Sequence, residues 1–130
     1  MILICPNCSE PMDERRLEGS DGGDLAIDLC FGCHVIWFDS LESPRLAPGA
    51  VMDLLRLIGR HRQKERQILR EHLNCPHCGS PLDRTDDLVK GGRIRYYRCS
   101  HDGGRLTPFL QFLIEKLSCA SGRINQTVYL

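Results

Sequence analysis

The sequence predicts a small β fold made of two similar modules, each a β-hairpin flanked by cysteine-bearing turns. An α-helical connector joins the modules, and a short C-terminal helix follows. Three observations predict this fold: a nine-residue segment that returns 70 residues later, eight cysteines that stand mostly in Cys-x2-Cys pairs, and apolar residues that alternate between those pairs. Only 4 Phe, 3 Tyr and 1 Trp occur in 130 residues. So few large side chains indicate small modules that need disulfides or bound metal to fold.

The internal repeat sets the module boundaries. Cys5–Asp13 (CPNCSEPMD) returns as Cys75–Asp83 (CPHCGSPLD), Gly22-Gly23 returns as Gly91-Gly92, and Cys30 returns as Cys99. We therefore divide the chain into a first module (residues 1–45), a helical connector (46–73), a second module (74–107), and a short helix with a polar tail (108–130). Repeats that share turn residues at fixed offsets are typical of duplicated folding units.

Each module contains two short strands around a glycine-rich turn. Residues 12–17 and 25–29 flank the first turn, and residues 82–89 and 93–98 flank the second. Leu25, Ile27 and Leu29 alternate with less apolar residues, which is the two-residue period of a half-buried strand. The hairpins therefore bring the cysteines at their two ends together.

The cysteines could form disulfides or hold metal. The first residues, Met1–Ile4, lack the basic flank and long apolar stretch of a secretion signal. The most apolar run, Val51–Ile58, is interrupted by Asp53 and Arg56, so we expect no membrane partner. We expect a cytoplasmic protein with reduced thiols, and paired cysteines there more often bind metal.

The first module predicts a four-thiolate zinc site. Its ligands are Cys5, Cys8, Cys30 and Cys33, two Cys-x2-Cys pairs separated by 21 residues. A Cys-x2-Cys turn directs both sulfurs to one ion, and backbone N–H groups in the turn can stabilise them. The alternative is redox chemistry, which needs an exposed thiolate of low pKa at a helix N-terminus; the sequence offers no such setting.

The second module predicts a less regular site. We expect Cys75, Cys78 and Cys99 as ligands with His101 as the fourth, and Asp102 as the alternative fourth ligand. A neutral imidazole is a better zinc donor than a carboxylate beside three thiolates. The competing interpretation is a decayed repeat that holds no metal.

Two structural zinc ions would explain how modules of this size fold. Ordering roughly 30 residues costs about as much as a tiny core recovers, whereas structural zinc adds roughly 10–16 kcal/mol. A catalytic zinc keeps one position for water, and four protein ligands leave none in the first module. We therefore expect no enzyme, with a small opening for catalysis at the second site.

Residues 5–42 resemble a known family. The pattern Cys5-Pro6-x-Cys8, Ile27-Asp28-x-Cys30-x2-Cys33 and Trp37-Phe38-Asp39-x2-Glu42 is similar to the TFIIB-type zinc ribbon of small bacterial proteins. His34 and Val35 stand where that family often has glycines. Arg98-Cys99 and Gly104–Phe109 resemble the second ribbon of two-ribbon members, which carry a histidine where this chain has Gly103. The resemblance implies two zinc ribbons, and implies transcription only weakly.

The connector favours one helix from Pro48 to Leu73. Its ends are apolar, but Gly59–Gln67 contains no apolar residue, so it would be a solvated helix or a surface for a partner. Residues 46–73 carry 6 basic and 3 acidic groups, whereas residues 1–45 carry 3 and 9. One interpretation is self-association into a homodimer through the apolar ends. His61 and Glu65 share a helical face but lack a third ligand.

Basic residues indicate where a nucleic acid could bind. The candidates lie in the connector and on the strand Arg93–Arg98, where cations alternate with aromatic rings. They are Arg60, Arg62, Lys64, Arg66, Arg93, Arg95 and Tyr97. Ile94 and Tyr96 should face the core of this strand. We also expect Trp37 and Phe38 to be core residues, and residues 109–117 to form an amphipathic helix. The sequence therefore favours a non-catalytic binding or adaptor protein whose partner is a nucleic acid or another protein.

Overall fold

The computed structural model describes residues 2–39, 45–61, 67–89 and 92–116. Its elements are β1 (Asp13–Glu18), β2 (Asp24–Cys30), β3 (Val35–Phe38), α1 (Pro48–Arg60), β4 (Asp83–Val89), β5 (Gly92–Arg98) and β6 (Arg105–Pro108). Residues 109–116 are helical and follow β6 directly. The two predicted hairpins, β1–β2 and β4–β5, and the C-terminal helix are confirmed.

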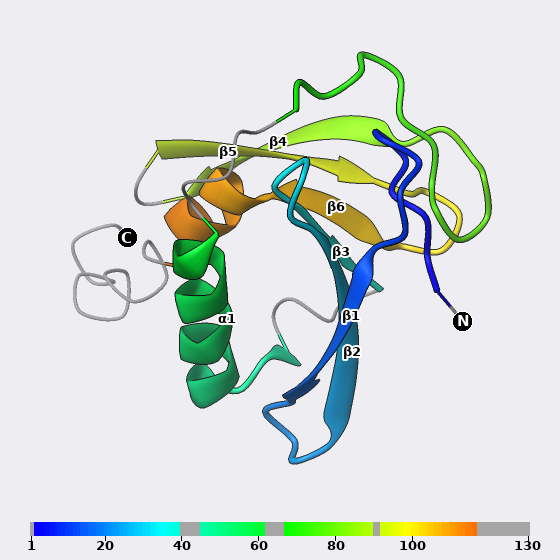
Figure 1. Cartoon of the computed structure of the whole chain (residues 1–130). Coiled ribbons are helices and arrows are strands. Elements are labelled where there is room, and N and C mark those ends of the chain that lie inside the picture. Colours follow the sequence, from blue (N-terminus) through cyan, green and yellow to red (C-terminus); the bar gives the residue numbers. More distant parts are fainter. Residues whose placement is uncertain (1, 40–44, 62–66, 90–91, 117–130) are drawn as a thin grey trace.

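All six strands form one antiparallel sheet in the order β1-β2-β3-β6-β5-β4 (Figure 1). The sequence did not predict β3 and β6, which pair with each other and carry the sheet from the first module into the second. β4, β5 and β6 run across the view of Figure 1, while β1 and β2 run down it. Such a change of strand direction is the accumulated twist of a sheet. The result is a small, mostly β protein in which the predicted modules share a sheet.

The sheet has an internal two-fold relation. The offset of 69 residues that relates Cys30 to Cys99 also relates Trp37 to Leu106, and these two residues pair directly across β3 and β6. The turns match as well, since His34 and Gly103, also 69 apart, both have positive φ angles, of 57° and 78°. Antiparallel pairing of equivalent strands is the arrangement expected of two equivalent units.

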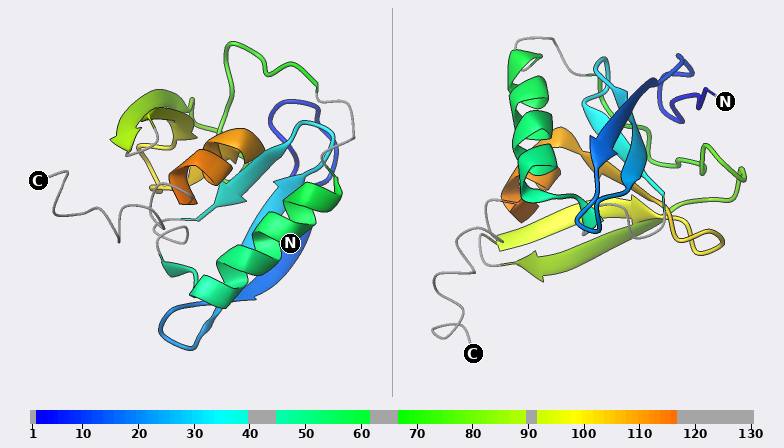
Figure 2. Two further views of the ribbon diagram at one scale, coloured as in Figure 1. Left: turned by 90° about the vertical axis from the view of Figure 1, so that its left-hand side faces the viewer. Right: turned by 90° about the horizontal axis from the view of Figure 1, so that it is seen from below.

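Helices cover one face of the first three strands. α1 and residues 109–116 lie beside each other there (Figures 1 and 2). Leu54 and Ile58 of α1 pack with Ile27 of β2, Ile36 of β3 and Phe112 in a cluster of buried residues. The apolar stripe of α1, whose fully buried members are Ala50, Leu54 and Ile58, therefore serves the chain's own core.

The connector differs from the prediction of one helix to Leu73. α1 ends at Arg60, and residues 67–73 contain no helix. Ile68 is 90% exposed, but Leu73 is 3% exposed and lies in the core near the cysteines. The long polar stretch before residue 67 has no apolar face to bury, so packing gives no reason to continue the helix. Backbone groups of residues 67–70 instead form hydrogen bonds with Asn7 and Gly32 in the turns of the first cysteine group.

Among the described residues, no helix combines the length and the apolar character that crossing a bilayer requires. The connector's apolar ends, on which a homodimer was predicted, are largely used within the chain. Met52 and Ile68 are its large apolar side chains that remain well exposed, at 49% and 90%. The structure leaves self-association a smaller apolar surface than the sequence indicated.

Candidate metal centres

Two groups of potential metal ligands converge at the cysteine turns. The first, called site one, consists of Cys5, Cys8, Cys30 and Cys33. The second, called site two, consists of Cys75, Cys78, Cys99 and Asp102. Within each group the ligand atoms all lie within 4.8 Å of one another. The sequence prediction of seven cysteine ligands in two groups therefore matches the grouping that the fold creates.

Sulfur spacing fits a metal and not a disulfide. The Sγ atoms of Cys8 and Cys30 are 3.6 Å apart, and those of Cys78 and Cys99 are 3.5 Å apart. A tetrahedral zinc with bonds of about 2.3 Å would hold its sulfurs about 3.8 Å apart, whereas a disulfide needs about 2.05 Å. The seven described cysteines are free thiols. Each group can thus accept one tetrahedral ion with small movements.

The same backbone turn builds the first half of both sites. The Cys5 N–H donates to Glu10 O at 2.8 Å, and the Cys75 N–H donates to Ser80 O at 2.7 Å. Ser9 and Gly79 hold the same place in these turns, with φ angles of 67° and 79°. Glycine adopts this angle without strain, whereas Ser9 adopts a conformation that side chains disfavour. The repeated sequence therefore encodes a repeated ligand-presenting turn.

Asn7 ties site one to the connector. Its Nδ2 donates to Cys33 Sγ at 3.3 Å and to Ile68 O at 3.1 Å. Its Oδ1 accepts a 2.7 Å bond from the Arg70 N–H. The Gln67 N–H adds a 3.0 Å bond to Gly32 O in the other cysteine turn. Asn7 is 4% exposed, so the amide is a buried bridge that orients one thiolate. The sequence offered no signal for this role except the position of Asn7 between two ligands.

Aromatic rings support the second turn of site one. Phe31, which lies between Cys30 and Cys33, stacks on His61 at the end of α1 with ring centroids 3.9 Å apart. Phe109 packs edge-on against Phe31 at 5.9 Å, and its N–H donates to His34 O at 2.7 Å. His61 therefore has a packing role, and the metal pair that it could have formed with Glu65 lies outside the described residues. Both helical segments help to fix this turn.

Site two is more open, and its group contains Asp102, the alternative fourth ligand, in place of His101. Asp102 Oδ2 lies 3.3 Å from Cys75 Sγ, and its Oδ1 accepts a 2.8 Å bond from the Gly104 N–H. His101, the predicted fourth ligand, is exposed and is not part of the group. Position 102 corresponds to Cys33 at the offset of 69, so the repeated turn places the side chain at 102 beside the three cysteines. Donor strength alone favoured histidine, but the backbone geometry selects the residue.

Trp37 joins the two modules beside site two. An added Cβ at Gly104 would lie 2.2 Å from Trp37 Cζ2, so the indole ring rests directly on that backbone. Trp37 is fully buried, and its Nε1 donates to Asp39 Oδ1 at 3.0 Å. The prediction that Trp37 and Phe38 are core residues is confirmed. The tryptophan of the first module thus packs on a turn of the second.

The thiols of the two sites have shifted pKa values. Hydrogen bonding to Cys30 and burial raise the pKa of Cys5, and the same thiol pair lowers the pKa of Cys30 to about 5. Burial raises the pKa of Cys33 to about 11 and that of Cys75 to about 12. Buried thiols that resist ionisation alone are ionised by a bound cation. Binding of an ion at these sites would therefore release protons.

The predicted nucleic-acid residues do not form one described surface. Arg62, Lys64 and Arg66 lie outside the described residues. Arg60 is exposed on α1, and Arg93 and Arg95 are exposed on β5. Arg95 Nε forms a 3.0 Å ion pair with Asp86 on the neighbouring strand. Ile94 and Tyr96 are buried as expected, but Tyr97 is half-buried against the cysteine-lined core and is only partly available for base stacking.

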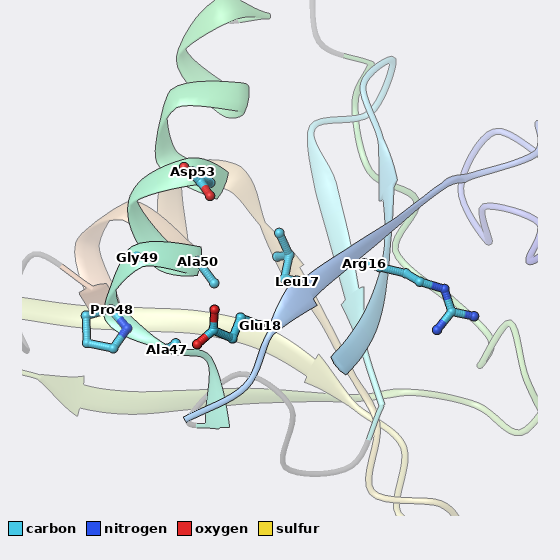
Figure 3. Close-up of a pocket in the computed structure, with 8 residues that line it drawn as sticks. All are labelled: Arg16, Leu17, Glu18, Ala47, Pro48, Gly49, Ala50 and Asp53. Carbon is cyan, nitrogen blue, oxygen red and sulfur yellow. The ribbon is translucent and has the colours of Figure 1, made fainter. Parts of the chain in front are cut away.

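A hollow between β1 and α1 offers little to a phosphate. Its volume is about 380 Å³, and its lining includes Arg16, Glu18 and Asp53. Figure 3 shows the Arg16 side chain pointing away from the start of α1, whereas Glu18 lies toward it. A carboxylate near the opening repels anions. This hollow does not add to the case for a nucleic-acid partner.

Comparisons with family models, with curated proteins and with solved structures found no match. The resemblance of residues 5–42 to the TFIIB-type zinc ribbon therefore rests on the sequence pattern. The structure adds two four-ligand groups with the spacing of metal sites.

Proposed function

We propose that the protein binds two zinc ions as structural ions in TFIIB-type zinc ribbons. The observation that carries the proposal is the convergence of four ligand atoms at each of two equivalent places in the fold. Thiolate-rich tetrahedral groups suit zinc among the common cellular ions. Both sets of buried cysteines, including Cys5, Cys33, Cys75 and Cys99, belong to one core cluster. Both ions would therefore contribute to the same core.

We further propose that the chain is not an enzyme and acts as a binding or adaptor protein. Four thiolates at site one would occupy every position of a tetrahedral zinc and leave none for a reacting water. Two partners are compatible with the surface. A nucleic acid would use Arg60, Arg93 and Arg95, and a protein, including a second copy, would use exposed apolar residues such as Met52.

Native mass spectrometry of protein purified without added metal tests the zinc proposal. We expect a mass excess of two zinc ions over the denatured and alkylated chain, whose eight cysteines should all be alkylated. Intramolecular disulfides in place of metal would refute the proposal. The same spectra report monomer or dimer.

Salt-dependent binding tests the choice of partner. If the partner is single-stranded nucleic acid, affinity should fall steeply as salt rises, because phosphate contacts release counterions. Arg93→Glu should weaken that binding, and Asp83→Asn, which changes an exposed charge on the adjacent strand, should not. Binding that ignores both salt and Arg93→Glu would exclude the nucleic-acid partner.

A further inference from the structure

Site two differs from site one in the donor that completes it. The offset of 69 residues places Asp102 where site one has Cys33, and the two residues enter their groups in equivalent turns. Zinc binds a carboxylate less strongly than a thiolate in a site that is otherwise made of thiolates. A ligand set of three sulfurs and one oxygen therefore holds its ion with one weaker bond.

Solvent reaches site two more easily. Cys78 and Asp102 are exposed, whereas three of the four ligands of site one are buried and Cys8 is half-buried. A hollow of about 260 Å³ does touch Cys8 and Cys30, so site one is not sealed. At site two, by contrast, the two exposed ligands are Cys78 and Asp102, and the Asp102 carboxylate is the weakest donor of the group. A competing ligand can therefore approach the position that is easiest to displace.

The support around the two sites also differs. At site one, Asn7 bonds a ligand sulfur and two connector residues, and Phe31 is held by rings from two other elements. At site two, hydrogen bonds to the ligands among the described residues come from its own turns, such as the His77 N–H to Cys75 Sγ and the Gly104 N–H to Asp102. His77 occupies the place of Asn7 but has an exposed side chain, 3.9 Å from Asp39. Hydrogen bonds and packing contacts that hold the ligand residues in place strengthen metal binding, and site one has more of them from other parts of the chain.

We propose that site two is the exchangeable metal site of the pair: it takes up and releases a zinc ion to competing thiolates or chelators, while site one retains its ion. This inference rests on the proposed function, since it requires that both groups bind zinc. In such an exchange an incoming ligand would take the place of Asp102, whose carboxylate would keep both electrons of its bond to the ion and its hydrogen bond from the Gly104 N–H. The zinc keeps its charge throughout, so no oxidant or reductant takes part.

Pulse alkylation during chelation tests the proposal on the unmodified protein. The two-zinc protein is mixed with EDTA, samples are treated briefly with iodoacetamide, and peptide mapping shows which cysteines have become reactive. We expect Cys75, Cys78 and Cys99 to be labelled first, at about ten times the rate of the site-one cysteines. Equal rates at both sites, or earlier labelling of Cys5 and Cys33, would overturn the proposal.

Two variants test the role of the fourth ligand. Asp102→Cys completes a four-thiolate group and should slow release from site two about ten-fold. His101→Ala changes the neighbouring exposed residue and should leave the rate unchanged. If His101→Ala speeds release and Asp102→Cys does not slow it, Asp102 is not the ligand that controls exchange. A protein that carries fewer than two zinc ions at the start would contradict the proposed function instead, so the two failures are distinguishable.

Discussion

The two cysteine sites share one backbone design and differ in their surroundings. Matching hydrogen bonds and matching positive φ angles build the turns of both sites. Yet Asn7 becomes His77 in the repeat, and Cys33 becomes Asp102. The first change removes a buried bridge to the connector, and the second replaces a buried thiolate with an exposed carboxylate. A duplicated turn thus conserves how ligands are presented, while single residues decide how firmly an ion is held.

Replacing the fourth ligand of each site should give the largest difference in stability between the two sites. Cys33→Ser should lose the ion of site one and much of its stabilisation, on the order of several kcal/mol. Asp102→Ser should cost less, because water can occupy the exposed position that the carboxylate leaves. Native mass and the thermal unfolding midpoint measure both effects. Equal losses in the two variants would remove the proposed distinction between the sites.

Adding a methyl group at the contact between the modules should have the next largest effect on stability. Gly104→Ala places a methyl group 2.2 Å from Trp37 Cζ2, so the indole or the turn must shift. We expect a loss of about 1–3 kcal/mol in the free energy of unfolding, measured by urea denaturation. Gly59→Ala, near the end of α1, meets no atom within 4 Å and should instead stabilise by about 0.5 kcal/mol. Destabilisation by both variants to the same extent would argue against the specific contact with Trp37.

The equivalent residues Asn7 and His77 provide a matched pair. Asn7→Ala removes the buried amide that bonds Cys33, Ile68 and Arg70, and leaves the groups that it bonded without this partner. We expect a cost of about 1–3 kcal/mol in unfolding free energy, with faster amide exchange at Arg70. His77→Ala removes an exposed side chain and should change stability by less than about 0.5 kcal/mol. A larger effect at His77 would reverse our ranking of the two sites.

Asp28 gives a pH-dependent test within the first half of the sheet. Its side chain is buried on β2, and its Oδ1 has no hydrogen-bond partner among the described residues. Burial and the charges of Glu14 and Asp39 raise its pKa to about 6, above the ordinary 3.8. Folding therefore favours the protonated acid, and the stability due to this group falls as pH rises from about 4 to 6.

Substituting Asp28 should remove that dependence. We expect Asp28→Asn to raise the unfolding free energy at pH 7 by about 1–2 kcal/mol and to have little effect at pH 4. Chemical denaturation at the two pH values measures the change. Asp24→Asn, an exposed position on the same strand, serves as the control. A gain of equal size at both pH values would mean that the ionised carboxylate is not the cause.

The sequence alone identified the seven cysteines of the two candidate metal groups, the repeat and the two hairpins. Those features are local: a Cys-x2-Cys turn, a glycine-rich turn and a two-residue apolar period each depend on neighbours in the chain. It also correctly placed Trp37 and Phe38 in the core, because large apolar residues after a cysteine turn have few other places to go.

The tertiary structure decided the contacts between distant residues. β3 and β6 are short, and their pairing becomes visible only when Trp37 meets Leu106 across the sheet. The choice of Asp102 over His101 depends on which side chain the turn directs inward, and donor strength does not reveal this. The bridge from Asn7 to Arg70 spans 63 positions and needs the connector to leave its helix. Local propensity sets elements and turns, whereas burial of shared surface sets how they combine.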